Sequence, residues 1–217
     1  MQQWLLTNDL SFFTEEVLST PDWRWDLTEL GREQAFQAGN WYRRWISPVA
    51  TNSYSSPSPR AITTSKIVNS GTDLMIINEL VEQEWGVLNQ TLPSLIRTAR
   101  RQFDADFRVS PDARPPGGET FREVFERVAP FARMIMEIQR RNPQTNTDIT
   151  CHFSVGRALR MHFQEISLVR YQETNGVNWE AHNCQTAVLF TDSHGAVKKA
   201  ISVSPAVPTD CSHVIWL

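Results

Sequence analysis

Twelve residues decide the fold of this chain: Ile149-Thr150-Cys151-His152-Phe153-Ser154-Val155-Gly156-Arg157-Ala158-Leu159-Arg160. The apolar start of the stretch predicts a strand, and the sequence from Ser154 to about Ile166 predicts a helix. A side chain at the carboxyl end of a parallel strand faces the crevice where α/β proteins bind ligands, and the free N–H groups of the following helix favour an anion there. His152 stands at this junction and is the first site candidate. The alternative is a histidine that only completes a hydrogen bond at a strand end in the core.

Strands and helices alternate along the rest of the sequence. Apolar runs predict strands at residues 4–6, 49–54 and 74–80, and apolar residues at helical spacing predict helices at 28–45, 61–69, 93–103 and 119–141. Pro130 is expected to kink or divide the last helix, and residues 186–203 are expected to form a hairpin. The pattern indicates a three-layer α/β/α sandwich with a mostly parallel central sheet. We expect one domain over residues 1–217, with an irregular, lid-like section at about 89–116.

The composition narrows the classes of function. With 41% hydrophobic and 21% charged residues the 217-residue chain can bury an ordinary core, and its formal net charge of -3 gives no basic field for nucleic acid. The three cysteines include no Cys-x-x-Cys pair, so we expect neither a metal site nor a redox disulfide, and no cofactor. The N-terminal residues lack a signal-peptide pattern, and no apolar run is long enough to cross a bilayer. We therefore expect a cytoplasmic protein that does not bind membranes.

Six short motifs follow one another along the chain. They are Leu27-Thr28-Glu29-Leu30-Gly31-Arg32-Glu33-Gln34-Ala35, Ser56-Pro57-Ser58-Pro59-Arg60-Ala61, Leu80-Val81-Glu82-Gln83-Glu84-Trp85-Gly86, Pro116-Gly117-Gly118-Glu119-Thr120-Phe121, Cys151-His152 with Arg157-Ala158-Leu159, and Asn183-Cys184. In this order and spacing the sequence resembles the histidine phosphatase superfamily, the phosphoglycerate-mutase-like proteins. Each motif alone is weak evidence, whereas the ordered set is specific.

The resemblance implies an α/β/α fold whose pocket holds a phosphate between two histidines and two arginines, with one histidine accepting the phosphoryl group covalently. By position, Arg60 matches the second pocket arginine, His152 the second pocket histidine and Glu82 the usual proton donor to the leaving group. These residue types suit the chemistry. Arginine offers a planar fork to phosphate oxygens, a cationic imidazole stabilises their charge, and a carboxylic acid protonates the departing alkoxide.

The sequence departs from the family at its first motif. Where the family has Arg-His-Gly, the aligned triplet here is Thr7-Asn8-Asp9, so Asn8 stands at the nucleophile position and Thr7 replaces the first arginine. A carboxamide has no lone pair basic enough to accept a phosphoryl group. An inward-facing Asp9 would repel a phosphate oxygen at about 4 Å by up to ~4 kcal/mol at an effective dielectric of about 20. Phe153 replaces the glycine that follows the second histidine, and its ring would either narrow the pocket or turn away from it.

Three functions remain open from the sequence. The first is a pseudophosphatase. It would bind a phosphorylated or anionic small molecule, a protein partner, or a second copy of the chain. The second is a phosphoric monoester hydrolase or mutase-like enzyme with altered chemistry, using His152, Glu82 and Arg60, or Asp9. The third is an ordinary phosphatase whose first motif lies elsewhere. Against this third possibility, no Arg-His-Gly occurs in the sequence, and the other histidines lie in a predicted helix, a loop, a turn and the tail.

Overall fold

The computed structural model describes residues 24–45, 51–69, 73–86, 110–173, 186–192, 197–203 and 215–216. The triplet Thr7-Asn8-Asp9, the first predicted strand and the predicted helix at 93–103 lie outside these residues. The prediction of a single domain over residues 1–217 therefore stays a prediction.

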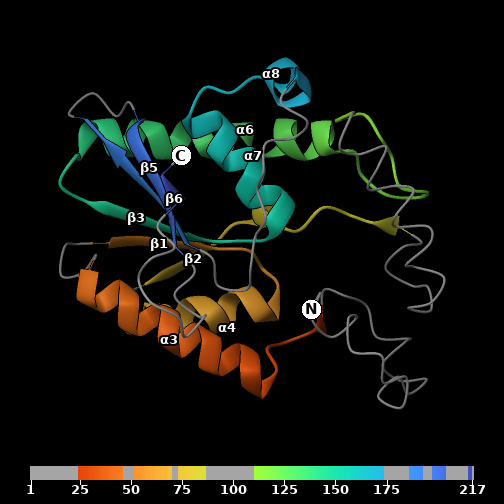
Figure 1. Cartoon of the computed structure of the whole chain (residues 1–217). Helices are drawn as coiled ribbons and strands as arrows, with labels where there is room; N and C mark the ends of the chain where they lie inside the picture. The colour runs from red at the N-terminus through yellow and green to blue at the C-terminus, as the bar shows by residue number, and fades with distance from the viewer. Residues whose placement is uncertain are drawn as a thin grey trace, which may run out of the picture.

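Helices and strands alternate through the described part of the chain (Figure 1). The helices are α3 (Glu29–Trp45), α4 (Pro59–Val68), the 3₁₀-helix η3 (Asn78–Leu80), α6 (Phe121–Arg141), α7 (Phe153–Phe163) and α8 (Leu168–Glu173). The strands are β1 (Thr51–Ser55), β2 (Leu74–Ile76), β3 (Asn146–Thr150), β4 (Thr186–Thr191), β5 (Val197–Val203) and β6 (Ile215–Trp216).

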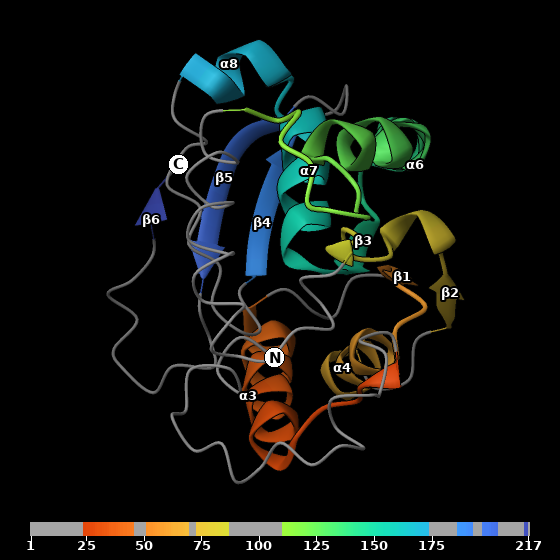
Figure 2. The ribbon, with the colours of Figure 1, turned by 90° about the vertical axis from the view of Figure 1, so that its right-hand side faces the viewer.

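A parallel sheet forms the middle layer. Its strand order is β2-β1-β3, with Ser53 of β1 opposite Leu74 on one side and opposite Asp148 on the other. Helices α3 and α4 lie together on one face of this sheet, and α6 and α7 lie on the other, as the two perpendicular views show (Figures 1 and 2). The prediction of an α/β fold with a parallel sheet is confirmed.

Capping residues fix where two of the long helices begin. The hydroxyl of Thr28 accepts a hydrogen bond from the Gly31 N–H at 3.1 Å, just before α3. At the start of α6 the Thr120 hydroxyl accepts from the Glu123 N–H, and the Glu123 carboxylate accepts from the Thr120 N–H. This reciprocal capping box satisfies two N–H groups that a helix start otherwise leaves open.

The core lies between α6, α7 and the sheet. The buried face of α6 repeats at helical spacing and consists of Phe121, Val124, Val128, Phe131, Ala132 and Ile135. It packs against the buried residues of α7 and against Tyr54 of β1, whose ring meets Phe131 edge to face at 5.4 Å. Burying each large side chain of this kind stabilises the fold by about 1.5–3 kcal/mol.

Two local predictions were wrong or incomplete. The run at 74–80 was expected to be one strand, but β2 ends at Ile76 and η3 follows it. The polar pair Asn78-Glu79 favours a turn over a strand, and the 3₁₀ turn brings Leu80 into the core beneath α6. The long helix α6 runs through the exposed Pro130 as one element, so Pro130 does not divide it.

A second, antiparallel sheet has the strand order β4-β5-β6. Residues of β4 and β5 pair from Thr186 with Val203 to Thr191 with Val197, which confirms the predicted hairpin.

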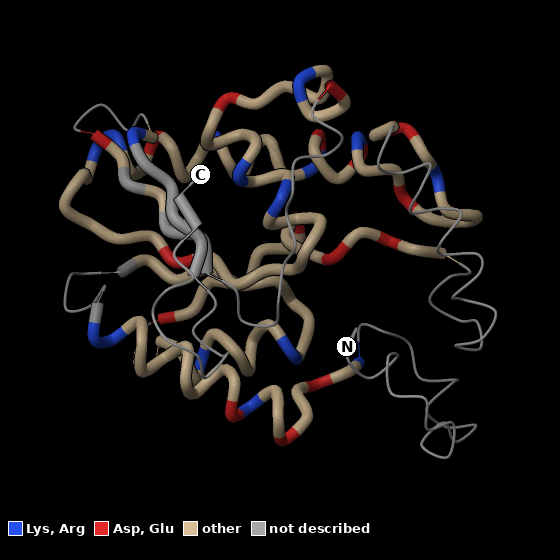
Figure 3. The backbone as a smooth tube through the Cα atoms, in the orientation of Figure 1, with Lys and Arg blue, Asp and Glu red and all other residues tan. Residues whose placement is uncertain are grey.

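Lys, Arg, Asp and Glu are interspersed along the described backbone, without one large area of a single sign (Figure 3). None of the described helices combines the length and the apolar character that a membrane span requires.

Candidate functional site

His152 lies where the sequence places it, between the end of β3 and the start of α7. It is the N-cap residue of α7, and its carbonyl accepts the first helical hydrogen bond from the Gly156 N–H at 2.7 Å. Its Nε2 lies 2.9 Å from the Ser56 hydroxyl oxygen, and the Ser56 N–H donates to the carbonyl of Thr150 at 3.0 Å. The imidazole is therefore fixed between the carboxyl ends of two neighbouring parallel strands.

The surroundings of His152 favour its neutral form. Burial lowers its pKa, the positive charges of Arg60 and Arg127 lower it further, and the result is a pKa of about 3. The resemblance implied a cationic imidazole. The structure instead favours the neutral imidazole, first because the ring is buried and second because two arginines already supply positive charge nearby.

Arg60 is carried by the first turn of α4. Pro59 occupies the first helical position, where its fixed φ suits a helix start, and the buried Ser58 is the N-cap residue. The guanidinium acts electrostatically on both Glu82 and His152. Arg60 thus brings a permanent positive charge to the strand ends where His152 lies.

Glu82 follows η3 and reaches the start of α7. Its Oε1 accepts hydrogen bonds from the N–H groups of Gln83 at 2.8 Å and Ser154 at 3.3 Å. Burial raises the pKa of this carboxyl, and the N–H groups of Gln83, Ser154 and Phe153 together with the charge of Arg60 offset only part of the rise. A carboxyl that keeps its proton to higher pH than an ordinary glutamate is suited to act as a general acid.

Phe153, the first residue of α7, packs along its own helix. Its ring centroid lies 4.4 Å from the guanidinium carbon of Arg157. Nη1 of Arg157 donates a hydrogen bond to the Tyr171 hydroxyl at 2.8 Å. The ring therefore forms a cation–π contact with the next turn of α7. The neighbouring Cys151 is a free thiol, and burial raises its pKa to about 12, so it is protonated and unreactive at neutral pH.

The structure brings three of the predicted site residues together. Glu82 and His152 lie at the start of α7 with Phe153 beside them, and the charge of Arg60, from a third segment, acts on both. The other predicted residues, Thr7, Asn8 and Asp9, lie outside the described residues. Within the described segments, no three His, Cys, Asp or Glu side chains converge as a metal site would require.

Two residues of this region were not predicted from the sequence. Ser56 could have been noticed, because it stands within the same motif as Arg60 and two residues after buried Tyr54. Arg127 gave no such signal. It lies on α6 far from Arg60 and Glu82 in sequence, and the packing of α6 against η3 brings its charge near His152.

The comparisons with known proteins agree with this geometry. The family model described as the histidine phosphatase superfamily (branch 1) matches residues 20–202, a stretch that begins after Thr7-Asn8-Asp9. No curated protein sequence matches the chain at a significant level.

Solved structures share the fold at low sequence identity. The mycobacterial glucosyl-3-phosphoglycerate phosphatase in complex with inorganic phosphate has a TM-score of 0.67 and 18% identity, covering 87% of this chain and 95% of that one. Mycobacterial hydrolase 1 has a TM-score of 0.64 and 18% identity, covering 91% and 86%. YhfR from Bacillus stearothermophilus has a TM-score of 0.61 and 23% identity, covering 82% and 85%. With most of its length matched by the family model, and with this fold, the chain belongs to the histidine phosphatase superfamily, branch 1.

Proposed function

We propose that this protein binds a phosphorylated or otherwise anionic ligand between Arg60 and His152 and does not turn it over through a phosphohistidine. The observation that carries the proposal is in the sequence. His152 is the first histidine of the chain, and Asn8 stands at the position aligned with the family's nucleophile. An amide nitrogen cannot accept a phosphoryl group, so the covalent route of the family lacks its acceptor.

The described geometry supports anion binding. A guanidinium favours phosphate oxygens, and the N–H groups at a helix start add to that preference. Arg60 supplies the guanidinium beside His152, while the N–H groups of Phe153 and Ser154 at the start of α7 already donate to the Glu82 carboxylate. A bound phosphate would also offset the charges that hold the pKa of His152 low, so binding is expected to strengthen as the pH falls. The similar mycobacterial phosphatase was solved with inorganic phosphate, which supports phosphate as the first probe.

The experiment compares binding with turnover. Inorganic phosphate is titrated into the protein by calorimetry, and hydrolysis of p-nitrophenyl phosphate is followed in parallel. We expect saturable phosphate binding and negligible hydrolysis. Arg60→Gln should weaken binding at least about tenfold, because a charge-assisted hydrogen bond is worth about 1.5–3 kcal/mol. Arg140→Gln is the matched control, since Arg140 pairs with Glu137 at the exposed end of α6.

Two outcomes would contradict the proposal. Hydrolysis at an ordinary enzymatic rate that disappears in His152→Ala would show a working catalyst. Absence of phosphate binding at millimolar concentration would instead favour the other binding function, a protein partner or a second copy of the chain. The triple variant Thr7→Arg/Asn8→His/Asp9→Gly restores the family motif, and a gain of hydrolysis in it would locate the defect at that motif.

A second candidate is a phosphoric monoester hydrolase with altered chemistry. Glu82 favours it, because a buried carboxyl with a raised pKa is what a general acid needs and what a simple binding site does not need. Glu82→Gln separates the two functions. In an enzyme it lowers turnover by about a hundredfold or more, whereas in a binding protein phosphate affinity changes only a few-fold.

We also keep the expectation of a cytoplasmic location. The free thiol of Cys151 suits a reducing compartment.

A further inference from the structure

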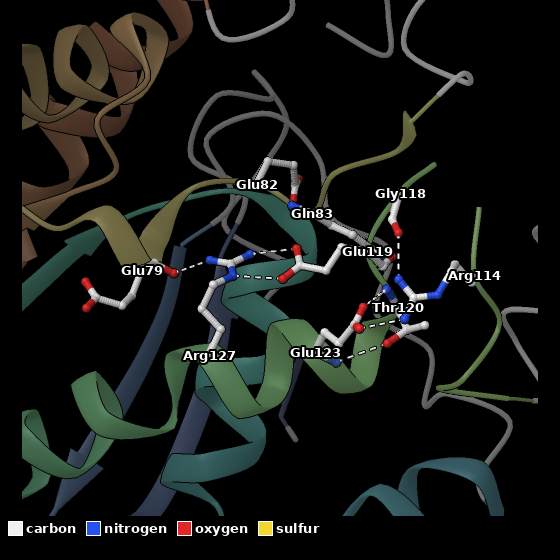
Figure 4. A network of polar contacts seen from close by, with 9 residues as sticks. All are labelled: Glu79, Glu82, Gln83, Arg114, Gly118, Glu119, Thr120, Glu123 and Arg127. Carbon is white, nitrogen blue, oxygen red and sulfur yellow. Dashed lines mark hydrogen bonds and ion pairs between the residues drawn. The ribbon is translucent and has the colours of Figure 1, made fainter. Parts of the chain in front are cut away.

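The segment that carries Glu82 is tied to the residues just before α6 (Figure 4). The Glu119 N–H donates to the carbonyl of Glu84 at 2.7 Å, and the Gln83 side chain donates back to the carbonyl of Glu119 at 2.7 Å. These two hydrogen bonds hold the chain immediately after Glu82 against Glu119.

An ion pair completes the attachment on the other side of Glu82. Arg127 donates from Nε and Nη2 to the two carboxylate oxygens of Glu119, both at 2.9 Å. Its remaining Nη1 donates to the carbonyl of Glu79 at 2.5 Å. Arg127 and Glu119 are only 25% and 19% exposed, so this bidentate pair is largely shielded from water and fixed in one geometry.

The close crossing of the two segments depends on a glycine. Gly86 has φ +56, and a Cβ atom at this position would lie 2.1 Å from the carbonyl oxygen of Pro116. Neither the conformation nor the space suits another residue. Segment 79–86 is therefore fixed at its beginning, its middle and its end, with Glu82 between the attachments.

The same arginine also acts on the candidate site directly. Burial lowers the pKa of His152 most, and the positive charges of Arg60 and then Arg127 lower it further, while Glu82 lies at the same helix start. From α6, Arg127 thus fixes the backbone that delivers Glu82, and its charge acts on His152.

We propose that Arg127, paired with Glu119, is a positioning residue of the Arg60–Glu82–His152 site: it holds the segment that carries Glu82 and supplies a second positive charge that favours an anion beside His152. The inference rests on the proposed anion site. It predicts that the pair contributes to ligand binding without touching the ligand itself.

The test uses Arg127→Gln, Arg127→Lys and, as control, Arg140→Gln, in the full chain. Arg140 lies on the same helix and pairs with Glu137 at the exposed end, so its removal changes the net charge equally. Two quantities are measured: phosphate affinity by calorimetry, and the titration midpoint of the His152 ring by NMR, assigned with His152→Ala. The ring titration needs no ligand.

We expect Arg127→Gln to weaken phosphate binding about tenfold and to raise the His152 midpoint, because a nearby positive charge is lost. Arg127→Lys keeps the charge and loses the planar fork, so it should restore the midpoint and leave affinity reduced a few-fold. The control should change neither quantity.

A purely structural role would lower stability without moving the His152 midpoint, and an unchanged midpoint in folded Arg127→Gln overturns the proposal. If Arg127→Gln does not fold, Arg127→Lys decides, since full phosphate affinity in that variant also overturns it. If the unaltered protein binds no phosphate, the proposed function fails, whereas the shift of the midpoint still tests the action of Arg127 on the site.

Discussion

Replacing Asp148 by asparagine should remove a large pH dependence from the stability of the fold. Asp148 lies within β3, opposite Ser53 of β1, and its carboxylate accepts a hydrogen bond from the side-chain amide of Asn69 at the end of α4. Burial raises the pKa of this carboxyl from 3.8 to about 6, and the hydrogen bond from Asn69 offsets only part of the rise. The folded protein therefore holds the Asp148 proton to a higher pH than the unfolded chain does.

The sign and size of the effect follow from this difference. Between about pH 4 and pH 6 the unfolded chain loses the Asp148 proton while the folded protein keeps it, so the free energy of unfolding falls as the pH rises. One pH unit of pKa difference is worth about 1.4 kcal/mol, and a rise from 3.8 to about 6 gives up to about 3 kcal/mol. The carboxamide that replaces the carboxyl in the variant does not titrate. Relative to the unaltered protein, Asp148→Asn should gain up to about 3 kcal/mol of stability between about pH 4 and pH 7.5.

The assay is urea unfolding at several pH values for both proteins. Asp112→Asn is the control. Asp112 is exposed, and its hydrogen bonds with Arg122 lower its pKa, so its removal should have a small effect of the opposite sign. If Asp148→Asn changes stability by the same amount at about pH 4 and at about pH 7.5, Asp148 does not have a raised pKa and this reasoning is refuted.

The remaining predictions concern the segments that frame the candidate site. Thr120→Ala removes the N-cap side chain of α6 and should lower the free energy of unfolding by about 1 kcal/mol in urea denaturation, and no loss would contradict the capping box. Gly86→Ala should destabilise by more than ~2 kcal/mol, because it combines a positive φ with a backbone clash at 2.1 Å. Gly156→Ala is its matched comparison, since its added Cβ meets only the Cys151 sulfur at 3.5 Å within α7 and should be neutral or stabilising by up to about 1 kcal/mol. Equal effects of the two glycine substitutions would contradict this account of the crossing.

Local chemistry made much of the fold predictable. Thr28 marked the start of α3, and the apolar spacing over 119–141 described α6 well. The junction at His152 could be recognised because the spacing of apolar residues changes there from that of a strand to that of a helix. Where the local signal was ambiguous, as at 74–80, the burial of Leu80 beneath α6 determined the outcome.

The candidate site was less predictable because its geometry depends on long-range packing. The motifs indicated Arg60, Glu82 and His152 as residue types, but not that burial, together with two arginines, would lower the pKa of the imidazole to about 3. Arg127 lies near the site because α6 packs against η3, where it donates a hydrogen bond to the carbonyl of Glu79. The spacing of residues in the sequence does not predict that contact. The pKa of a buried group likewise depends on neighbours that are distant in sequence.

The most direct test of the central claim follows an aryl phosphate ester by ³¹P NMR in the presence of the unaltered protein. Binding without turnover predicts that the ester resonance broadens or shifts with protein concentration, that this change is lost in Arg60→Gln, and that the ester persists for hours. Rapid appearance of inorganic phosphate, abolished by His152→Ala, would contradict the proposal and show a working phosphatase in a chain that has no Arg-His-Gly motif.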